Sequence, residues 1–149
     1  MASSHDQGKP PANTIAMLGQ AYSLLGFRIV EGVVGSGHPI KARYSAVFGQ
    51  FDPGSAPTRR ATELARGAGM SPQAMGELLD EMEELGYLRR DGDPSDRRAK
   101  LISMTTLGTH ALRAGGQAIG SLEAEIARTL GDDGRAELRR LLELLLAEG

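Results

Sequence analysis

The chain has 149 residues, no cysteine and a formal net charge of −2 at pH 7. A chain of this length can bury one hydrophobic core, and the lack of cysteine excludes disulfides and sensing by a reactive thiol. The slightly acidic balance excludes nucleic-acid binding through overall basicity, so such binding would need a local cluster of basic residues.

Residues 1–13 (MASSHDQGKPPAN) are small, polar and proline-bearing, and they lack the apolar core of a signal peptide. No apolar run in the chain reaches the ~20 residues that cross a bilayer. We therefore expect a disordered N-terminal tail over residues 1–13, a single domain over residues 14–149, and a cytoplasmic protein with no membrane contact.

Apolar residues recur at steps of three and four between residues 14 and 34, which predicts a first amphipathic helix. The segment Gly35-Ser36-Gly37 is expected to end this helix. A shorter helix is predicted at about residues 39–51, before the helix-breaking segment Asp52-Pro53-Gly54.

Two helices joined by a tight turn are predicted between residues 61 and 85 (ATELARGAGMSPQAMGELLDEMEEL). Gly69 is typical of the residue that follows a helix, and Ser71 and Pro72 are typical of the first positions of the next one. Apolar residues keep one buried face through both helices: Leu64, Ala65, Ala68, Met70, Met75, Leu78, Leu79, Met82 and Leu85. This pattern indicates a helix-turn-helix, in which the second helix reads the major groove of DNA.

The outward face of the second helix carries residues that we expect to contact DNA, namely Ser71, Gln73, Ala74, Gly76 and Glu77. Gln73 can hold adenine through two hydrogen bonds, Glu77 can accept from cytosine or orient an arginine, and the Ser71 hydroxyl suits a phosphate. The bare backbone at Gly76 allows DNA or another helix to approach closely. The alternative, given equal weight, is an ordinary solvated helix face.

Residues 87–105 (YLRRDGDPSDRRAKLISMT) predict a β-hairpin, with Leu101 and Ser103 facing opposite to Ile102 and Met104. Turn-forming Asp-Gly and Asp-Pro pairs mark its tip, where three basic residues gather: Arg97, Arg98 and Lys100. An arginine there suits a narrow minor groove, and Asp96 is expected to pair with a neighbouring arginine and fix its direction. The alternative is a charged, solvated hairpin end.

After the hairpin, Thr105 or Thr106 can cap a long helix that residues 131–134 (GDDG) close. The pair Gly115-Gly116 inside it predicts either a bend, which could act as a flexible joint, or a close contact between helices. A final helix carries a broad apolar stripe: Leu138, Leu141, Leu142, Leu144, Leu145 and Leu146. Such width favours a partner chain, and the alternative is a core within one chain.

The segment ELARGAGMSPQAMGELLDEMEELGYLRRDGDPSDRRAKLISMT resembles the core of the multiple antibiotic resistance regulator (MarR) family of transcription factors, closely so over residues 61–108. The resemblance implies a mainly α-helical fold with a small β-hairpin wing, that is, a winged helix-turn-helix. The winged-helix core would cover about residues 39–105, and dimerisation helices would cover about residues 14–34 and 106–148.

The same resemblance implies a homodimer on a palindromic operator in double-stranded DNA, with the Asp-x-Arg element of the wing at Asp96 and Arg98. Two residues depart from the family pattern. Pro72 lies at a position that is often basic in relatives, and Arg60 replaces the Ser or Thr that would complete a capping box with Glu63.

Relatives commonly sense small aromatic molecules in a cleft between the dimerisation and DNA-binding lobes. The side chains that could surround such an effector here are Phe27, Arg28, Tyr44, Phe48 and His110. We expect no cofactor and no metal, because His5, His38 and His110 are scattered. No enzyme motif appears, so the prediction is a transcriptional repressor, and the alternative is a winged helix that binds protein instead of DNA.

Overall fold

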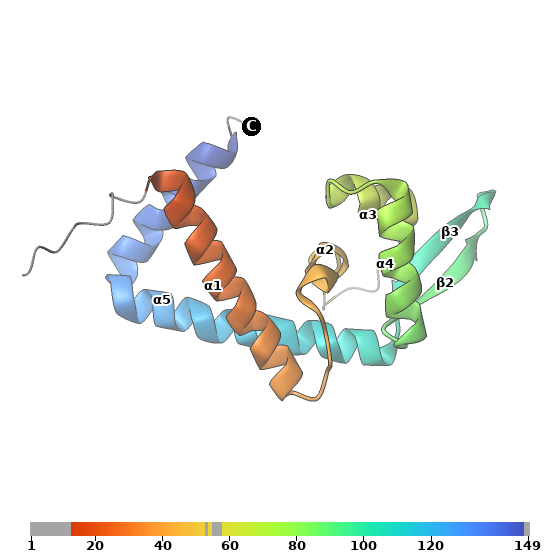
Figure 1. The fold of residues 1–149 in the computed structure, drawn as a ribbon, viewed down its shortest axis with the longest axis horizontal. Helices are drawn as coiled ribbons and strands as arrows, with labels where there is room; N and C mark the ends of the chain where they lie inside the picture. Colours follow the sequence, from red (N-terminus) through yellow and green to blue (C-terminus); the bar gives the residue numbers. More distant parts are fainter. Residues whose placement is uncertain (1–12, 53, 55–57, 148–149) are drawn as a thin grey trace, which may run out of the picture.

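The computed structural model describes residues 13–52, 54 and 58–147. Most of the predicted disordered tail lies outside the described residues, and only Asn13 of that segment is described. The long helices α1 and α5 lie together on one side of the molecule, and a group of shorter helices and strands lies on the other (Figure 1). In chain order the elements are α1 (Thr14–Gly35), the 3-10 helix η1 (Ala42–Tyr44), α2 (Ser45–Phe48), β1 (Arg59–Arg60), α3 (Ala61–Gly67), α4 (Pro72–Glu84), β2 (Leu88–Asp93), β3 (Asp96–Met104) and α5 (Thr106–Ala147).

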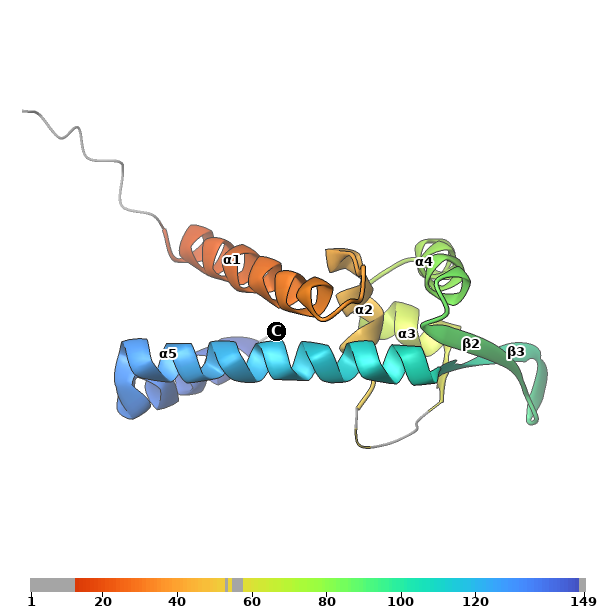
Figure 2. The same cartoon turned by 90° about the horizontal axis from the view of Figure 1, so that it is seen from below.

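The first helix, α1, begins where the side chain of Asn13 accepts a hydrogen bond from the main-chain N–H of Ala16 at 2.9 Å. It runs alongside the first part of α5 (Figure 2). The two helices approach most closely at Gly32, where an added Cβ would lie 2.9 Å from the Cβ of Ala118. A paired contact between Arg28 and Glu125, at 2.6 and 3.0 Å, joins the same two helices.

The long C-terminal helix changes direction at Gly131, whose φ of 72° and ψ of 167° are not helical. The prediction of a break at residues 131–134 is therefore confirmed at its first residue. Gly115 and Gly116 keep helical backbone, so the expected bend at this pair is wrong. The alternative for this pair was a close contact between helices, and it holds only for Gly115. A Cβ added at Gly115 would lie 3.8 Å from the side chain of Val33, whereas a Cβ added at Gly116 would have no neighbour within 4 Å.

The segment predicted as a helix at residues 39–51 is shorter than expected, because only the 3-10 helix η1 and the four residues of α2 are helical. Pro39 disfavours helical backbone in the residue before it, and Lys41 is extended with a φ of −107° and a ψ of 152°. Gly49 then ends α2. The segment nevertheless packs beneath the helix-turn-helix as predicted, because Tyr44 and Val47 are fully buried there.

The core of the winged-helix lobe contains most of the apolar face that the sequence predicted for α3 and α4, but Leu85, the last residue of that predicted face, is 41% exposed. Four members of that face are fully buried, namely Leu64, Met75, Leu79 and Met82. The rings of Tyr44, Phe48 and Tyr87 pack on one another edge to face, with Phe48 and Tyr87 centroids 5.8 Å apart. Gly69 has a φ of 62° at the turn between α3 and α4, which is the left-handed conformation predicted for it.

The sheet has the order β1-β3-β2 and is antiparallel throughout. The β2–β3 pairing runs from Leu88 opposite Met104 to Gly92 opposite Lys100, and a bulge follows between Gly92 and Asp93. The predicted alternation along β3 is incomplete, because Ser103 is buried together with its neighbour Ile102. The physical reason is that β3 is the central strand, and its base also packs against α5.

The start of α5 is fitted tightly against the base of the hairpin. As predicted, Thr105 caps the helix: its hydroxyl accepts from the main-chain N–H of Gly108 at 3.0 Å and donates to the carbonyl of Gly86. A Cβ on Gly108 would lie 2.9 Å from the carbonyl carbon of Tyr87. Glycine at this position therefore lets α5 lie directly on the base of the wing.

Candidate nucleic-acid interface

The N-terminal half of α4 carries the predicted groove-reading residues. Ser71 caps the helix by accepting the main-chain N–H of Ala74 at 3.2 Å. Ser71, Gln73 and Glu77 are exposed, whereas Ala74 and Gly76 are half-buried. The amide of Gln73 donates to the carboxylate of Glu77 at 3.3 Å, so these two side chains lie together on one face. A purine contact by Gln73 would therefore replace an existing, weak hydrogen bond.

The second half of α4 is acidic, and three of its carboxylates, those of Asp80, Glu81 and Glu83, are paired with basic residues of neighbouring elements. Arg90 of β2 donates to Asp80 at 2.6 Å and to Glu83 at 2.7 Å, and it also reaches the carbonyl of Gly76 at 3.4 Å. On the other side of the helix, Glu81 accepts from three groups of the α1–α2 connection: Lys41, Arg43 and the hydroxyl of Tyr44. These pairs neutralise most of the negative charge that the sequence places on the recognition helix.

The wing, formed by β2 and β3, projects from the body of the lobe beside α4 (Figure 1). The predicted DNA-contacting residues Arg97, Arg98 and Lys100 are exposed on it. Among the ion pairs of the described residues, none involves these three side chains. Their charge is therefore available to a phosphate-bearing partner.

The predicted pairing of Asp96 with an arginine side chain is not what the structure shows. The carboxylate of Asp96 accepts from the main-chain N–H of Arg98 at 2.9 Å, so it shapes the backbone at the start of β3. The carboxylate that holds an arginine side chain is Asp93, which binds Arg60 of β1 at 2.5 and 2.9 Å. A short acidic side chain next to the main-chain N–H two residues on prefers this local bond, which explains the difference.

Asp93 is also the centre of the turn at the wing tip. Its second oxygen accepts from the main-chain N–H of Ser95 at 2.8 Å and from the Ser95 hydroxyl at 2.7 Å. These bonds, together with the guanidinium of Arg60, hold the pKa of Asp93 below its ordinary value of 3.8. Sequence reasoning missed this network. The Asp-Pro-Ser pattern was a signal for the local turn, but nothing local indicated Arg60, which lies 33 residues away along the chain.

The five residues predicted around an effector do not come together at one site. Phe27 is 63% exposed on α1, Arg28 is paired with Glu125, and His110 is exposed on α5. Tyr44 and Phe48 are buried in the core of the DNA-binding lobe, where the Tyr44 hydroxyl donates to Glu81.

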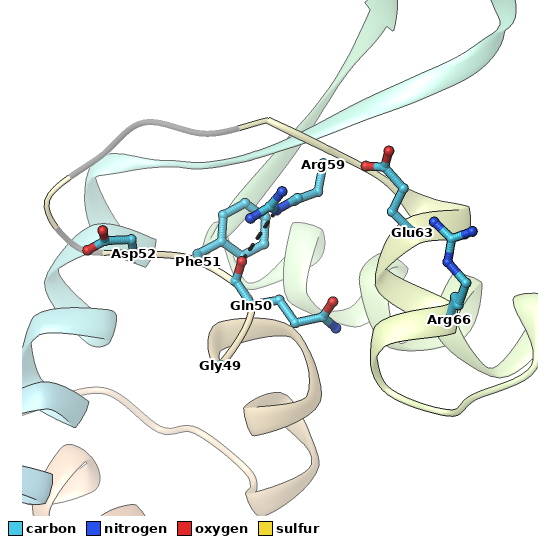
Figure 3. Close-up of a pocket in the computed structure, with 7 residues that line it drawn as sticks. All are labelled: Gly49, Gln50, Phe51, Asp52, Arg59, Glu63 and Arg66. Atoms are coloured by element: carbon cyan, nitrogen blue, oxygen red, sulfur yellow. Dashed lines mark hydrogen bonds between the residues drawn. The ribbon is translucent and has the colours of Figure 1, made fainter. Parts of the chain in front are cut away.

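Two open cavities border the DNA-binding lobe. One, of about 560 Å³, lies between α1, α2 and the N-terminal half of α4, and Tyr22, Arg43, Met70 and Glu77 contribute to its lining. The other, of about 590 Å³, lies between the end of α2, β1 and α3. Figure 3 shows its polar lining, in which the side chain of Arg59 donates to the carbonyl of Gln50 at 3.4 Å.

Exposed apolar side chains make up a surface on two helical segments at the end of the molecule opposite the wing, namely residues 15–27 of α1 and the part of α5 after Gly131 (Figure 1). We call it the terminal-helix surface, and it consists of Ile15, Met17, Leu18, Tyr22, Leu24, Phe27, Leu138, Leu141, Leu144, Leu145 and Leu146, each at least 39% exposed. A monomeric protein rarely leaves so many large apolar side chains in water.

The described residues contain neither a membrane-spanning helix nor a group of metal ligands. Over residues 13–52, 54 and 58–147, no helix is long and apolar enough to cross a membrane. Over the same ranges, no group of three His, Cys, Asp or Glu side chains is placed to hold a metal ion.

The fold defines a winged helix-turn-helix protein, and comparison with known proteins shows which family it is similar to. The model of the MarR family matches residues 53–99. The matched residues lie in the winged-helix region, so this region is similar to the MarR family, in agreement with the sequence resemblance.

Curated relatives agree with this assignment. Two of them are the HTH-type transcriptional repressors Rv2887 of Mycobacterium tuberculosis and Mb2911 of Mycobacterium bovis, each 28% identical over 89 residues. The match covers 60% of this chain and 64% of each relative, so it spans less than two thirds of their length.

Solved structures share the fold over most of the chain. The repressor CouR, bound to a 23-mer DNA duplex, has a TM-score of 0.76 at 23% identity, covering 97% of this chain and 99% of its own. MarR of E. coli has a TM-score of 0.69 at 24% identity, covering 95% and 99%. PcaV of Streptomyces coelicolor, in complex with its natural ligand, has a TM-score of 0.67 at 21% identity, covering 99% and 98%.

Proposed function

We propose that this protein is a transcriptional repressor that binds a palindromic operator in double-stranded DNA as a homodimer. The observation that carries the proposal is the wing, which presents Arg97, Arg98 and Lys100 without ion-pair partners among the described residues, next to the exposed N-terminal half of α4. Supporting it, the CouR structure of similar fold is bound to DNA. We further propose one domain over residues 14–149, with no catalytic activity.

The residues divide by the part of DNA that each would contact. In this proposal α4 lies in the major groove, where Gln73 reads adenine and Glu77 reads cytosine or orients an arginine. The cap residue Ser71 contacts a phosphate, and the half-buried Ala74 and Gly76 let the helix approach the bases closely. Arg97 and Arg98 enter the adjacent minor groove, and Lys100 contacts a phosphate.

The terminal-helix surface supports the homodimer. A twofold axis through it would cover the same apolar patch on both chains, since an isologous interface is self-complementary. The two α4 helices would then lie about one turn of DNA apart, roughly 34 Å, and the operator would be an inverted repeat.

The test is selection from a random-sequence DNA pool with the purified protein at two salt concentrations. We expect an inverted repeat to be enriched by the wild type, and the enrichment to be lost with Arg98→Ala. Arg113→Ala is the matched control, because it removes the same charge from an exposed position on α5, away from the wing. No enrichment by the wild type, with binding indifferent to Arg98, would overturn the proposal in favour of a protein-binding winged helix.

We also propose that a small aromatic effector releases the repressor from DNA. The similar structure of PcaV was solved with its natural ligand. The cavity of about 560 Å³ has a volume that suits a small molecule, and Tyr22 of α1 contributes to its lining. Two of the five residues expected at an effector site, Phe27 and Arg28, lie on the same helix. Titration of the protein–operator complex with phenolic acids tests this. Release by none of them, at concentrations that leave the free protein folded, would contradict it.

A further inference from the structure

Arg60 occupies a position where a small capping residue is the ordinary choice. It is the residue before α3, and a guanidinium cannot accept a hydrogen bond from the first turn of a helix as a Ser or Thr hydroxyl can. Only the reciprocal half of the cap is present, in which Glu63 accepts the main-chain N–H of Arg60 at 2.9 Å. The side chain of Arg60 is thus free to bind elsewhere.

That side chain reaches the tip of the wing. Its Nε and Nη2 atoms donate to one oxygen of Asp93 at 2.9 and 2.5 Å, and Nη2 also lies 3.1 Å from the hydroxyl of Ser95. The other oxygen of Asp93 is bound by Ser95, so both carboxylate oxygens are satisfied. The Asp93 side chain is only 5% exposed, although it lies in a surface hairpin.

The contact between Arg60 and Asp93 lies at a point where the wing has little other support. β1 pairs with β3 only at Leu101 and Ile102, so the part of the wing beyond these residues is a two-stranded ribbon. A bulge between Gly92 and Asp93 interrupts that ribbon, and bulges bend and twist the strand that carries them. Among the described residues, the bonds from Arg60 are the side-chain hydrogen bonds that link the segment beyond the bulge, residues 93–99, to the start of the helix-turn-helix.

We propose that Arg60 and Asp93 are positioning residues that fix the direction of the wing tip relative to α4, so that Arg97 and Arg98 meet DNA in one orientation. This inference rests on the proposed DNA-binding function. Holding the tip before binding lowers the entropy lost on complex formation, because the ribbon does not have to be ordered at that step. The pair also keeps the charge of Asp93 neutralised at a surface that approaches phosphates.

The two effects can be separated with three variants. Arg60→Ala removes the link and leaves the charge of Asp93 unpaired, whereas Arg60→Ala/Asp93→Asn removes the link with no unpaired charge. Arg60→Lys keeps a positive charge but loses the two-pronged geometry. Arg66→Ala is the matched control, because it removes an exposed arginine from α3, the helix that follows Arg60, and this arginine has no ion pair among the described residues.

DNA affinity is measured by fluorescence anisotropy on the operator selected by the wild type, and thermal unfolding confirms that each variant is folded. We expect Arg60→Ala to weaken binding about tenfold, the scale of one charge-assisted hydrogen bond. The Arg60→Ala/Asp93→Asn variant should keep a defect, Arg60→Lys should recover part of the affinity, and Arg66→Ala should bind like the wild type. In an Arg98→Ala background, Arg60→Ala should have less than about a twofold further effect, because its role acts through the tip.

Full additivity of Arg60→Ala and Arg98→Ala would overturn the positioning role, since it would mean that Arg60 acts independently of the tip. Amide hydrogen exchange without DNA gives a second test. Exchange at Ser95 and Arg98 should become faster in Arg60→Ala, while the base of the hairpin stays protected. Unchanged exchange at the tip would overturn the inference even if operator binding is found. If the wild type selects no operator, the proposed function fails, and the exchange measurement still decides whether Arg60 holds the wing.

Discussion

Replacing Gly108 with alanine should separate the base of the wing from α5, which lies on it. The added Cβ would lie 2.9 Å from the carbonyl carbon of Tyr87 and 3.0 Å from the sulfur of Met104, and it would overlap the Tyr87 carbonyl oxygen. That oxygen accepts the main-chain N–H of Thr105 at 3.1 Å, so backbone rather than a flexible side chain has to move.

The magnitude follows from three contributions. Overpacking of this kind costs about 1–3 kcal/mol, and loss of the Thr105–Tyr87 hydrogen bond costs about 1 kcal/mol. Alanine regains at most about 1 kcal/mol in helix propensity. We therefore expect the free energy of unfolding to fall by about 1–3 kcal/mol, and the Tm by about 2–4 °C for each kcal/mol in a protein of this size.

Urea and thermal unfolding at a fixed protein concentration provide the assay. Gly116→Ala and Gly120→Ala are matched controls on the same helix, because nothing lies within 4 Å of a Cβ at either position. Both should raise the stability, by up to about 1 kcal/mol. A Gly108→Ala variant as stable as these two would refute the reasoning, since it would show that α5 can move away from the wing without cost.

Three further predictions concern single side chains. Glu81→Gln should lower the free energy of unfolding by about 1–2 kcal/mol, measured by urea denaturation, because Lys41, Arg43 and Tyr44 lose a charged acceptor; an unchanged urea midpoint would contradict this. Because the folded pKa of Asp93 lies below its ordinary value of 3.8, its stabilising contribution is complete above about pH 4 and is lost as the pH falls through the folded pKa. The difference in Tm between the wild type and Asp93→Asn should therefore shrink below about pH 4, and a constant difference would argue against the pairing. Leu145→Glu, at a side chain that is 60% exposed in one chain, should leave the fold intact but dissociate the dimer in sedimentation; a dimer of unchanged stability would place the interface elsewhere.

The helical part of the fold was predictable because its signals are local in sequence. The spacing of Leu64, Met75 and Leu79 marked the buried face of the helix-turn-helix, and Ser71 and Thr105 marked helix starts that the structure confirms. The segment after Pro39 was assigned too much helix because its apolar residues satisfy helical spacing, while the extended backbone at Lys41 depends on how the chain enters the core. At Gly115-Gly116 the sequence could not distinguish a bend from a contact, because both use glycine.

The candidate site was predictable only where neighbours in sequence are also neighbours in space. The sequence placed Arg97 and Arg98 at a hairpin tip correctly, because turn residues flank them. It could not show that Asp93 would hold Arg60, since that contact depends on β1 pairing with the far side of β3. For the same reason, Tyr44 and Phe48 were expected near an effector, whereas the structure buries them in the core.

The pairing of charges reconciles a net charge of −2 with the proposed binding of a polyanion. Four carboxylates near the interface are held by a basic group from another element: Asp80 and Glu83 by Arg90, Glu81 by the α1–α2 connection, and Asp93 by Arg60. Glu77 and Asp96 instead accept from the Gln73 amide and from the main-chain N–H of Arg98. The positive charges of the wing tip have no such partner among the described residues. The local field at the wing is therefore set by which charges are paired rather than by their total. Because so few charges remain unpaired, binding should show a moderate salt dependence that falls by about one counterion per protomer when one wing arginine is removed.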